Sequence, residues 1–239
     1  MRLLITGAAG RIGSWLTRSL RYHYELVLTD VRPPDETYGL PFATADIANV
    51  TEVRPLIEGI DTVVHLAADG SPTAPWESVL PHNIIGTYNV FESAHQSGCR
   101  RVIFASSVNA ILGYPEEVQV NTQMPVRPPN LYGASKAWGE ALARFYADQR
   151  GLSAICLRFG WVVASDDPAL RRDAPELDIA LTLTDLTQLV VASIEAPSDL
   201  RFGIFHGISK SRWNRLDISD ASAMLGYVPQ DDPFVLATQ

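Results

Sequence analysis

The sequence predicts an α/β fold built around a doubly wound parallel sheet. Apolar runs that suit strands alternate with amphipathic runs that suit helices over the first 160 residues. The strand-like runs are continuously apolar, as in parallel strands that are covered on both faces. A glycine-rich turn joins the first strand-like run to the first helix-like run. Together these observations predict a Rossmann-type sheet with helices on both faces.

The core elements are expected in a βαβαβ order, with right-handed crossovers. Short apolar runs predict strands at residues 2–6, 25–30, 41–46, 61–68, 101–107 and 152–160. Apolar residues with helical spacing predict helices at residues 11–23, 51–58, 77–98 and from Tyr132 onward. Pro81 lies inside the third of these helices and predicts that this helix begins late, because proline disrupts a helix interior.

After residue 160 the alternation is weaker. Residues 163–178 are polar and loop-like. A helix capped by Thr184 is expected at residues 184–197, followed by a strand at 202–207. A last capped helix is expected to end at Gly226.

The length of 239 residues suits one compact unit. Within it we predict a dinucleotide-binding core domain of residues 1–160, which contains the glycine-rich turn. Residues 161–239 are expected to form a small substrate-binding lobe that interleaves with the sheet edge, at about the lower size limit for a unit with its own core.

Composition excludes several classes of protein. The net charge is −8 and no basic run occurs, so nucleic acid is not an expected partner. Two cysteines without a CxxC spacing favour a reduced, cytoplasmic chain over a disulfide framework. No apolar run approaches the length of a membrane span, and the N-terminus lacks the pattern of a secretory signal.

The turn "ITGAAGRIG" predicts a dinucleotide site. Gly7 permits the tight turn, Gly10 lets the backbone approach a pyrophosphate, and Gly13 lets helix and strand pack closely. The helix N-terminus offers free N–H groups to the phosphates. The expected cofactor contacts in this turn are Gly7, Ala9, Gly10, Arg11, Ile12 and Gly13.

Asp30 ends the second expected strand, where a carboxylate can accept hydrogen bonds from the adenosine ribose. This favours NAD over NADP, although Arg32 weakens the preference and Asp30 is alternatively a turn residue. Asp46 and Ile47 are expected to flank the adenine, unless Asp46 only caps a helix. The small residues that end the strand "HLAA" let a cofactor cross the strand ends, and the expected contacts are Leu66, Ala67 and Ala68.

Several motifs in a consistent order carry a family resemblance. They are the GxxGxxG spacing, Asp30, "HLAA", "HNIIGTYNVFESA", "FASS" and "YGASK". With these motifs the chain resembles the extended short-chain dehydrogenase/reductases, the NAD-dependent epimerase/dehydratase family, from residue 1 to about 207. Within that family it is most similar to the uronate dehydrogenases and related sugar dehydrogenases.

The resemblance implies a mechanism. Tyr132 would act as general acid/base, and Lys136, one turn along the same helix face, would lower its pKa and hold the nicotinamide ribose. Ser107, 25 residues before Tyr132, would hydrogen-bond the substrate oxygen, whereas Ser106 is interpreted as structural. Asn83 matches a family position near the cofactor, or is only a core amide.

The resemblance also implies a small sugar or uronic acid as substrate. Only 79 residues follow residue 160, which leaves little surface for a nucleotide-sugar. The expected substrate contacts are Ser71, Ser107, Val108, Asn109, Trp161 and Arg171, with Thr73 as an alternative to Ser71. Arg171 or Arg172 would pair with a carboxylate, unless both are solvated surface residues.

Two departures count against a uronate. Uronate dehydrogenases carry Asn-His after the serine, where this chain has Val108 and Asn109, and a polar residue where it has Trp161. The alternatives are an epimerase of the same family, or a non-catalytic dinucleotide sensor. The histidines show no metal-ligand spacing, so no metal is expected. By analogy with relatives we expect a homodimer or higher homo-oligomer built on the helices at 77–98 and after Tyr132.

Overall fold

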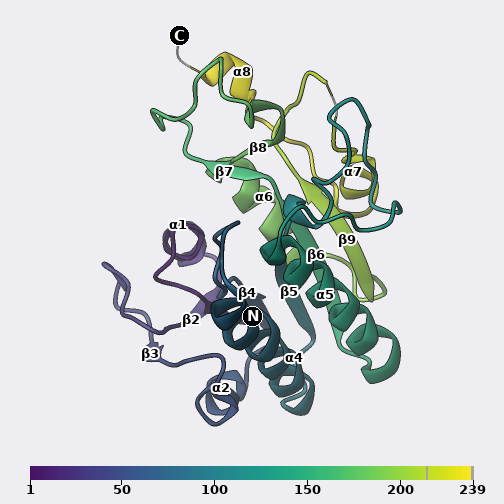
Figure 1. Cartoon of the computed structure of the whole chain (residues 1–239). Helices are drawn as coiled ribbons and strands as arrows, with labels where there is room; N and C mark the ends of the chain where they lie inside the picture. The colour runs from purple at the N-terminus through teal and green to yellow at the C-terminus, as the bar shows by residue number, and fades with distance from the viewer. Residues whose placement is uncertain (214, 238–239) are drawn as a thin grey trace.

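The computed structural model describes residues 1–213 and 215–237, and its centre is a seven-stranded sheet in the order β3-β2-β1-β4-β5-β6-β9 (Figure 1). All six pairings in this sheet are parallel. The strands are β1 (Arg2–Thr6), β2 (Glu25–Asp30), β3 (Phe42–Thr44), β4 (Thr62–His65), β5 (Arg101–Ser107), β6 (Ser153–Phe159) and β9 (Phe202–Gly207). The chain winds outward from β1 in one direction and from β4 in the other, so the doubly wound fold is confirmed.

The central strands form because apolar side chains alternate to both faces and both faces are covered. Leu3, Leu4 and Ile5 of β1 are each 0% exposed, and all seven residues of β5 are buried. A strand that is apolar on both faces buries apolar surface under the helices on each side of the sheet. Such strands are therefore favoured in the interior of the sheet over its edge.

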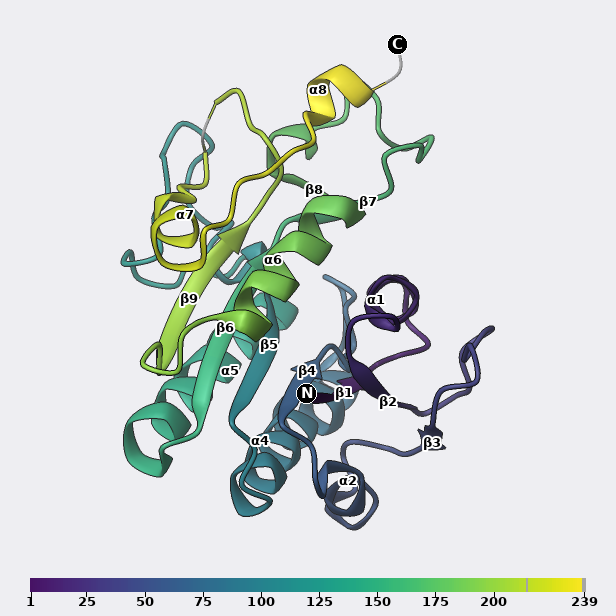
Figure 2. The same cartoon turned by 180° about the vertical axis from the view of Figure 1, so that it is seen from behind.

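Helices cover both faces of the sheet (Figures 1 and 2). One layer consists of α2 (Val50–Ile57), α4 (Gly86–Gln96) and α5 (Leu131–Phe145), and the other of α1 (Arg11–Leu20) and α6 (Leu183–Glu195). Each layer packs on its own hydrophobic cluster, with Phe91 of α4 in one cluster and Leu16 and Leu189 in the other. None of the helices in the described ranges is long and apolar enough to cross a membrane.

The helix expected at residues 77–98 differs from its prediction. It begins early, with α3 (Trp76–Val79), continues as a π-helical segment at Leu80–Ile85, and becomes regular in α4. Pro81 falls in the π-helical segment. Since proline lacks an N–H and clashes with the carbonyl of the preceding turn, the chain widens its turn there instead of starting the helix later.

The part after residue 160 contains elements that the sequence pattern did not reveal. A second, two-stranded parallel sheet pairs β7 (Trp161–Val163) with β8 (Ala180–Thr182) across the segment expected to be only a loop. The remaining helices are α7 (Ser219–Leu225) and α8 (Pro233–Leu236), and shorter turns span Val108–Ala110, Tyr146–Arg150 and Leu177–Ile179.

Two helix ends test the capping predictions. The predicted cap Thr184 is wrong: Thr182 caps α6, and its side chain accepts the Asp185 N–H at 3.2 Å. The end of α7 at Gly226 is confirmed, with this glycine in the left-handed conformation at φ 68°. The small sheet and α8 lie at the carboxyl ends of the main strands (Figure 1).

Candidate active site

Two adjoining cavities open along the carboxyl edge of the main sheet. Their volumes are about 580 and 380 Å³. Both are lined by Gly7, Gly10, Leu66 and Ala68, so they form one continuous cleft over the end of β1. Ligand sites in open α/β sheets lie at this edge, where the strand order changes direction. The cleft is therefore the candidate active site.

The smaller cavity has acidic and apolar walls. Asp30, Asp46 and Ile47 line it, together with Ala67 and Arg32. The Asp30 carboxylate accepts the Ala9 N–H at 2.9 Å, which fixes the end of β2 against the glycine turn. Asp46 accepts the Ala48 N–H at 2.9 Å and thus also acts as a local cap. A carboxylate at the end of β2 suits the ribose hydroxyls of an adenosine.

The glycine turn leaves room for a dinucleotide. Gly7 has φ +72°, a conformation that glycine adopts without strain. A Cβ on Gly13 would lie 2.2 Å from the Gly7 carbonyl oxygen, so only glycine allows α1 to begin this close to β1. The turn and the start of α1 present Gly10, Arg11, Ile12 and Gly13 to the larger cavity. These features fit a pyrophosphate at a helix N-terminus.

A buried histidine supports the neighbouring wall of the cleft. Its ring nitrogens face the hydroxyls of Thr6 at 2.8 Å and Thr87 at 3.3 Å. Burial lowers the pKa of His65 to about 3, so the ring is neutral. The Thr6 hydroxyl also accepts the N–H groups of Leu66 and Ala67 at 3.2 Å each. His65 thus fixes the end of β4, next to Leu66 and Ala68, which line both cavities.

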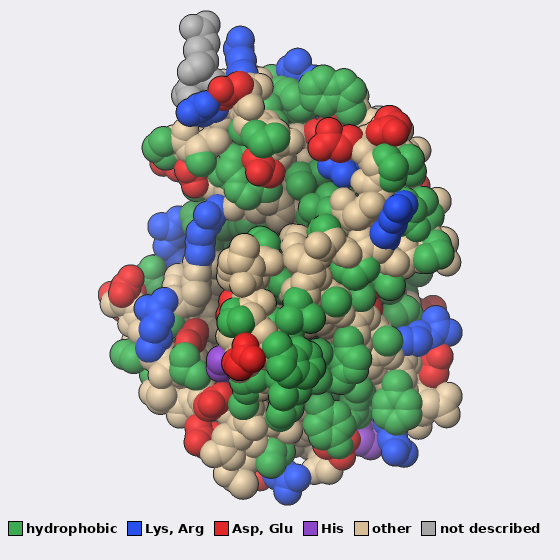
Figure 3. All heavy atoms as spheres, in the orientation of Figure 1, with side chains coloured by type: hydrophobic (Ala, Val, Ile, Leu, Met, Phe, Trp, Pro, Cys, Tyr) green, Lys and Arg blue, Asp and Glu red, His purple; other side chains and the backbone are tan. Residues whose placement is uncertain are grey.

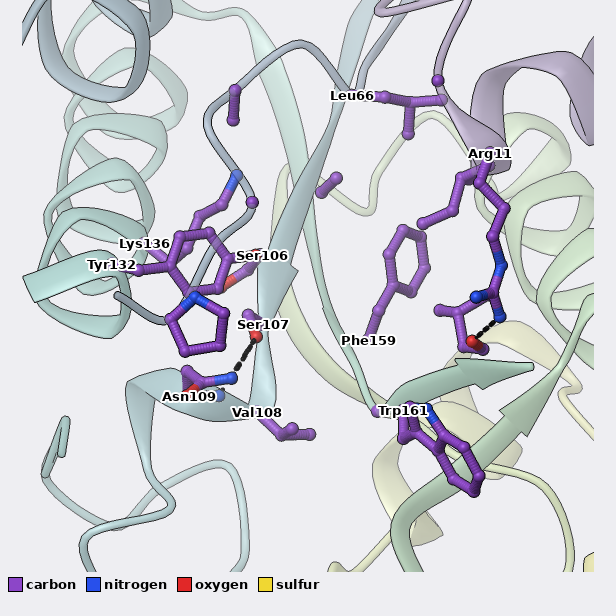
Figure 4. A pocket seen from close by; sticks show the side chains of 18 of the residues that line it. Arg11, Leu66, Ser106, Ser107, Val108, Asn109, Tyr132, Lys136, Phe159 and Trp161 are labelled. Carbon is purple, nitrogen blue, oxygen red and sulfur yellow. Dashed lines mark hydrogen bonds between the residues drawn. The ribbon is translucent and has the colours of Figure 1, made fainter. Parts of the chain in front are cut away.

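The larger cavity contains the predicted catalytic residues. Ser107 ends β5, while Tyr132 and Lys136 lie in the first turns of α5, and the three side chains face the same space (Figure 4). Arg11 lies across the cavity from Tyr132 and donates a hydrogen bond to the Val162 carbonyl (Figure 4). The structure thus brings Gly7 and Lys136, 129 positions apart in the chain, to one cavity.

Lys136 is almost completely buried, with 4% of its surface exposed. Its Nζ lies 4.9 Å from the centroid of the Phe104 ring and 5.6 Å from that of the Tyr132 ring. Burial lowers the pKa of Lys136 to about 8. The charged amine is therefore stabilised mainly by aromatic faces at this end of the cavity.

The environment of Tyr132 differs from the prediction. Burial raises the pKa of Tyr132, the hydrogen bond with Ser107 opposes the rise, and the charge of Asp69 adds to it. Lys136 is not among the groups that shift this pKa, although its Nζ lies 5.6 Å from the centroid of the phenol ring. The lowering of the Tyr132 pKa that the resemblance implies for Lys136 thus stays a prediction, as does the lowering expected from the positive charge of the nicotinamide.

The far end of the larger cavity has mixed polarity. Val108, Asn109 and Trp161 line it, as do Glu176 and Ile179. The side chain of Asn109 also contacts Ser107 (Figure 4). This end of the cavity is contributed in part by residues after position 160.

Four predicted contacts do not line either cavity. Ala9 reaches the cleft only through Asp30, and the Ser71 hydroxyl pairs with Thr73 at 3.0 Å. Asn83 is 2% exposed and holds the main chain of Asp69 with bonds of 2.8 and 3.0 Å. Arg171 points to Asp173 at 2.6 Å on the surface, and Arg172 lines a separate cavity.

Sequence reasoning missed several residues that line the cleft. Phe159 ends β6 and Gly160 follows it, and Val31 follows β2. The available signal was their place at the carboxyl ends of parallel strands, where ligands bind. Asn130 was missed as well. Its position directly before the expected helix was the signal for a cap.

Comparison with known proteins agrees with this geometry. Residues 3–177 match the model of the NAD-dependent epimerase/dehydratase family. The chain is 34% identical over 249 residues to the NAD-dependent glucose-6-phosphate dehydrogenase of Haloferax volcanii, covering 96% of this chain and 93% of that protein. It is 35% identical over 233 residues to the uronate dehydrogenase of Pseudomonas putida, covering 96% and 84%.

Solved structures show the same likeness. The uronate dehydrogenase of Agrobacterium tumefaciens, crystallised as a tyrosine-to-alanine variant with NAD, superposes with a TM-score of 0.87 at 32% identity. The superposition covers 100% of this chain and 90% of that one. Sequence and structure therefore point to the same group of proteins over nearly the whole chain.

Proposed function

The chain belongs to the NAD-dependent epimerase/dehydratase family, and we propose that it is an NAD-dependent dehydrogenase that oxidises a hydroxyl of a small sugar or sugar acid. The observation that carries the proposal is the shared cleft. The glycine turn and the carboxylate of Asp30 line one part of it, and Tyr132, Lys136 and Ser107 line the other. Both the dinucleotide and the reacting sugar thus have a place within reach of one phenol.

The residues of the cleft fit NAD. Gly10, Arg11 and Ile12 would lie along the pyrophosphate, and Asp30 would accept hydrogen bonds from the adenosine ribose. When bound, NAD accepts a hydride from the substrate carbon. The carboxylate of Asp30 opposes a 2′-phosphate at that position, which supports NAD over NADP.

Side chains of the protein would carry out the transfer of the proton from the sugar hydroxyl. Tyr132, as phenolate, would accept the proton of the sugar hydroxyl, and Ser107 would donate a hydrogen bond to the same oxygen. Lys136, whose Nζ lies 5.6 Å from the centroid of the Tyr132 ring, would place its charge beside the ring. It would also hold ribose hydroxyls, as the family resemblance implies. The raised pKa of Tyr132 means that a cation bound nearby would promote ionisation.

The size of the C-terminal region supports a small substrate. We propose that residues 161–239 serve as the substrate lobe, with Trp161 and Ile179 against the sugar. The relatives named above are dehydrogenases of glucose 6-phosphate and of uronates. Arg171 stays a proposed partner of a substrate carboxylate, which requires it to leave Asp173.

A substrate panel tests the function. Pure protein, NAD and a series of aldoses, sugar phosphates and uronates should give rising absorbance at 340 nm with at least one compound. Tyr132→Phe should still bind NAD but lose turnover. An epimerase would instead interconvert sugars without net NADH, and a sensor would bind NAD without turnover in either form. Absence of any NADH across the panel contradicts the dehydrogenase.

We also propose a homodimer through α4 and α5. Hydrophobic side chains gather over these helices (Figure 3). Ile85, directly before α4, Tyr88 of α4 and Phe145 of α5 are 41%, 47% and 44% exposed. A second copy of the same face would bury them by two-fold symmetry. Light scattering should give twice the chain mass, and Tyr88→Asp should halve it. The two buried free cysteines, Cys99 and Cys156, support a cytoplasmic location.

A further inference from the structure

The hydrogen bonds at the start of α5 have a fixed direction. Asn130 caps this helix, and its Oδ1 accepts the Gly133 N–H at 2.7 Å. A main-chain N–H can only donate, so the amide oxygen of Asn130 must face the helix. Its Nδ2 then faces outward and donates to Oδ1 of Asn109 at 2.8 Å. The helix itself therefore sets the orientation of both amides.

The same logic extends from Asn109 to the active site. Because Oδ1 of Asn109 is the acceptor, its NH₂ group points the other way, to Oγ of Ser107 at 3.3 Å (Figure 4). The main-chain N–H of Asn109 donates to the same Oγ at 3.1 Å. A serine oxygen has two lone pairs, and two N–H donors occupy both of them. The Ser107 hydroxyl is left with one role, that of a donor.

The hydrogen of that hydroxyl is free to be donated to the phenol. Ser107 is 5% exposed, and Tyr132 lines the same cavity. Their hydrogen bond lowers the pKa of Tyr132, as expected when the phenol oxygen is the acceptor. A donated hydrogen bond stabilises an oxygen that carries negative charge.

We propose that Asn109 and Asn130, the amide pair, are positioning residues that hold the Ser107 hydroxyl as a donor toward the Tyr132 oxygen and the substrate oxygen. This assignment rests on the proposed dehydrogenase function, and it adds what sets the direction of one hydrogen bond in that mechanism. It also changes the role expected for Asn109 from substrate contact to orientation of Ser107.

Close packing keeps the amide pair in place. A Cβ on Gly133 would lie 2.1 Å from the Asn109 carbonyl oxygen, so the start of α5 touches the turn that follows β5. The turn itself is closed by the bond from the Ile111 N–H to the Val108 carbonyl at 2.9 Å. Ser107 and Tyr132 are thus held by one continuous contact between strand end and helix start.

The charges that face the phenol do not depend on the amide pair. Lys136 of α5 lies 5.6 Å from the ring centroid, and Asp69, after β4, raises the pKa of Tyr132. Both stay in place when only the amides are changed. A change in the titration of Tyr132 can then be traced to Ser107.

Asn130→Asp tests the proposal, because aspartate caps a helix as well as asparagine does. The new carboxylate accepts the Gly133 N–H but cannot donate to Asn109, so the Asn109 amide turns and presents its oxygen to Ser107. The Ser107 hydrogen then goes to that oxygen and leaves the phenol. We expect the Tyr132 phenolate fraction, at a pH below its midpoint, to fall about tenfold.

The readout is the phenolate absorbance near 295 nm, taken as the difference between each protein and its Tyr132→Phe counterpart. This measurement needs no substrate. It therefore tests whether the amide pair orients Ser107 even where the sugar panel shows no turnover. With an active sugar, kcat should fall in parallel while the unfolding midpoint stays unchanged. If the unmodified protein shows no turnover with any sugar, that result counts against the proposed dehydrogenase function but not against the role of the amide pair.

A double-mutant cycle separates orientation from added charge. In a Ser107→Ala background, Asn130→Asp should no longer shift the Tyr132 titration. An equal shift with and without the hydroxyl overturns the proposal, because the carboxylate would then act directly. No shift in either background overturns it too.

Two further variants guard the interpretation. Asn121→Asp adds the same charge to an exposed side chain whose oxygen also accepts main-chain N–H groups, at 3.0 and 3.1 Å, and should leave Tyr132 unchanged. Asn109→Leu removes the amide without adding charge. It should shift the Tyr132 titration in the same direction by a smaller amount, since the main-chain N–H still occupies one lone pair. If Tyr132 titrates in Asn109→Leu as it does in the unmodified protein, the proposal is contradicted.

Discussion

Glu140 of α5 and Arg158 of β6 form a two-pronged ion pair, with Nε–Oε1 at 2.7 Å and Nη2–Oε2 at 2.8 Å. Both side chains are buried, with 3% and 1% exposed. The Ser106 hydroxyl donates to the same carboxylate at 2.6 Å. Helix α5, which carries Tyr132, is thereby tied to the strand end that carries Ser107.

The first prediction concerns this pair. Arg158→Met should lower the free energy of unfolding by about 3–5 kcal/mol, because it leaves a buried carboxylate without its partner. Arg158→Met with Glu140→Leu should recover part of the loss. Urea unfolding measures both. As a control, Asp148→Asn breaks the exposed pair with Arg144 and should cost less than about 1 kcal/mol. The prediction is contradicted if the double variant loses as much free energy of unfolding as Arg158→Met and Glu140→Leu lose separately, added together.

The second prediction is the pH dependence of turnover. The rate should rise with pH as the Tyr132 phenol loses its proton. Asp69 raises the pKa of Tyr132, so Asp69→Asn should move the midpoint of the rise to lower pH, by less than about one unit. Initial rates from pH 6 upward measure it at saturating NAD, since the positive charge of the bound cofactor promotes ionisation of the phenol. Asp35→Asn, in an exposed loop, is the control, and a midpoint that moves upward in Asp69→Asn refutes the sign.

The third prediction is acid sensitivity from buried histidines. Burial lowers the pKa of His206 to about 4 and that of His65 to about 3, from 6.5 in the unfolded chain. The unfolded chain therefore binds more protons below pH 6.5, and stability present above that pH is lost as the pH falls. Each histidine should cost about 2 kcal/mol between pH 8 and pH 5.

Unfolding by urea at several pH values tests the histidine prediction. His206→Gln should flatten the dependence on pH by about half. His23→Gln, at an exposed position, should leave it unchanged. A pH dependence that is the same in all three proteins would show that His206 does not carry the effect.

The fourth prediction concerns the glycine turn. Gly13→Ala should weaken NAD binding at least tenfold and destabilise the fold, since its Cβ would meet the Gly7 carbonyl oxygen at 2.2 Å. Titration of protein fluorescence with NAD measures binding. Gly70→Ala, where a Cβ has no atom within 4 Å, is the control for stability. Unchanged NAD affinity in Gly13→Ala would place the dinucleotide elsewhere.

The fifth prediction concerns the choice between NAD and NADP. Asp30→Ala should raise the ratio of kcat/KM for NADP to that for NAD by tenfold or more, because it removes the carboxylate that repels a 2′-phosphate and leaves Arg32 in the same cavity. Asp35→Ala should keep the ratio. An unchanged ratio in Asp30→Ala would show that this carboxylate does not determine the choice between NAD and NADP.

Much of the fold followed from burial alone. Strands β1, β2, β5 and β9 have the predicted bounds, because each is a short apolar run that pairs with at least one parallel neighbour. The strands β7 and β8 were missed, because three-residue strands gain their stability from pairing with each other, 19 positions apart. The early start of the helix before Pro81 was missed because a π-helical turn accommodates a proline that an α-helix would exclude.

Residues of the candidate site could be predicted from the sequence where the residue type and its place in a motif indicate a role. Gly13, Asp30, Ser107, Tyr132 and Lys136 were predicted and lie on one cleft, while their roles stay predictions. The contacts made by Asn130, and the direction of its hydrogen bonds, could not be read from the chain. They depend on how a helix start meets a turn 21 positions earlier.

The position of β9 at the edge of the sheet bears on how the protein is made. β6 ends at Phe159, but its outer neighbour begins only at Phe202. A nascent chain that has not yet released β9 from the ribosome exposes the unpaired backbone of β6, an edge that invites pairing with other chains. Biosynthesis must therefore pass through a stage in which nearly every core strand exists and the sheet is still open on one side.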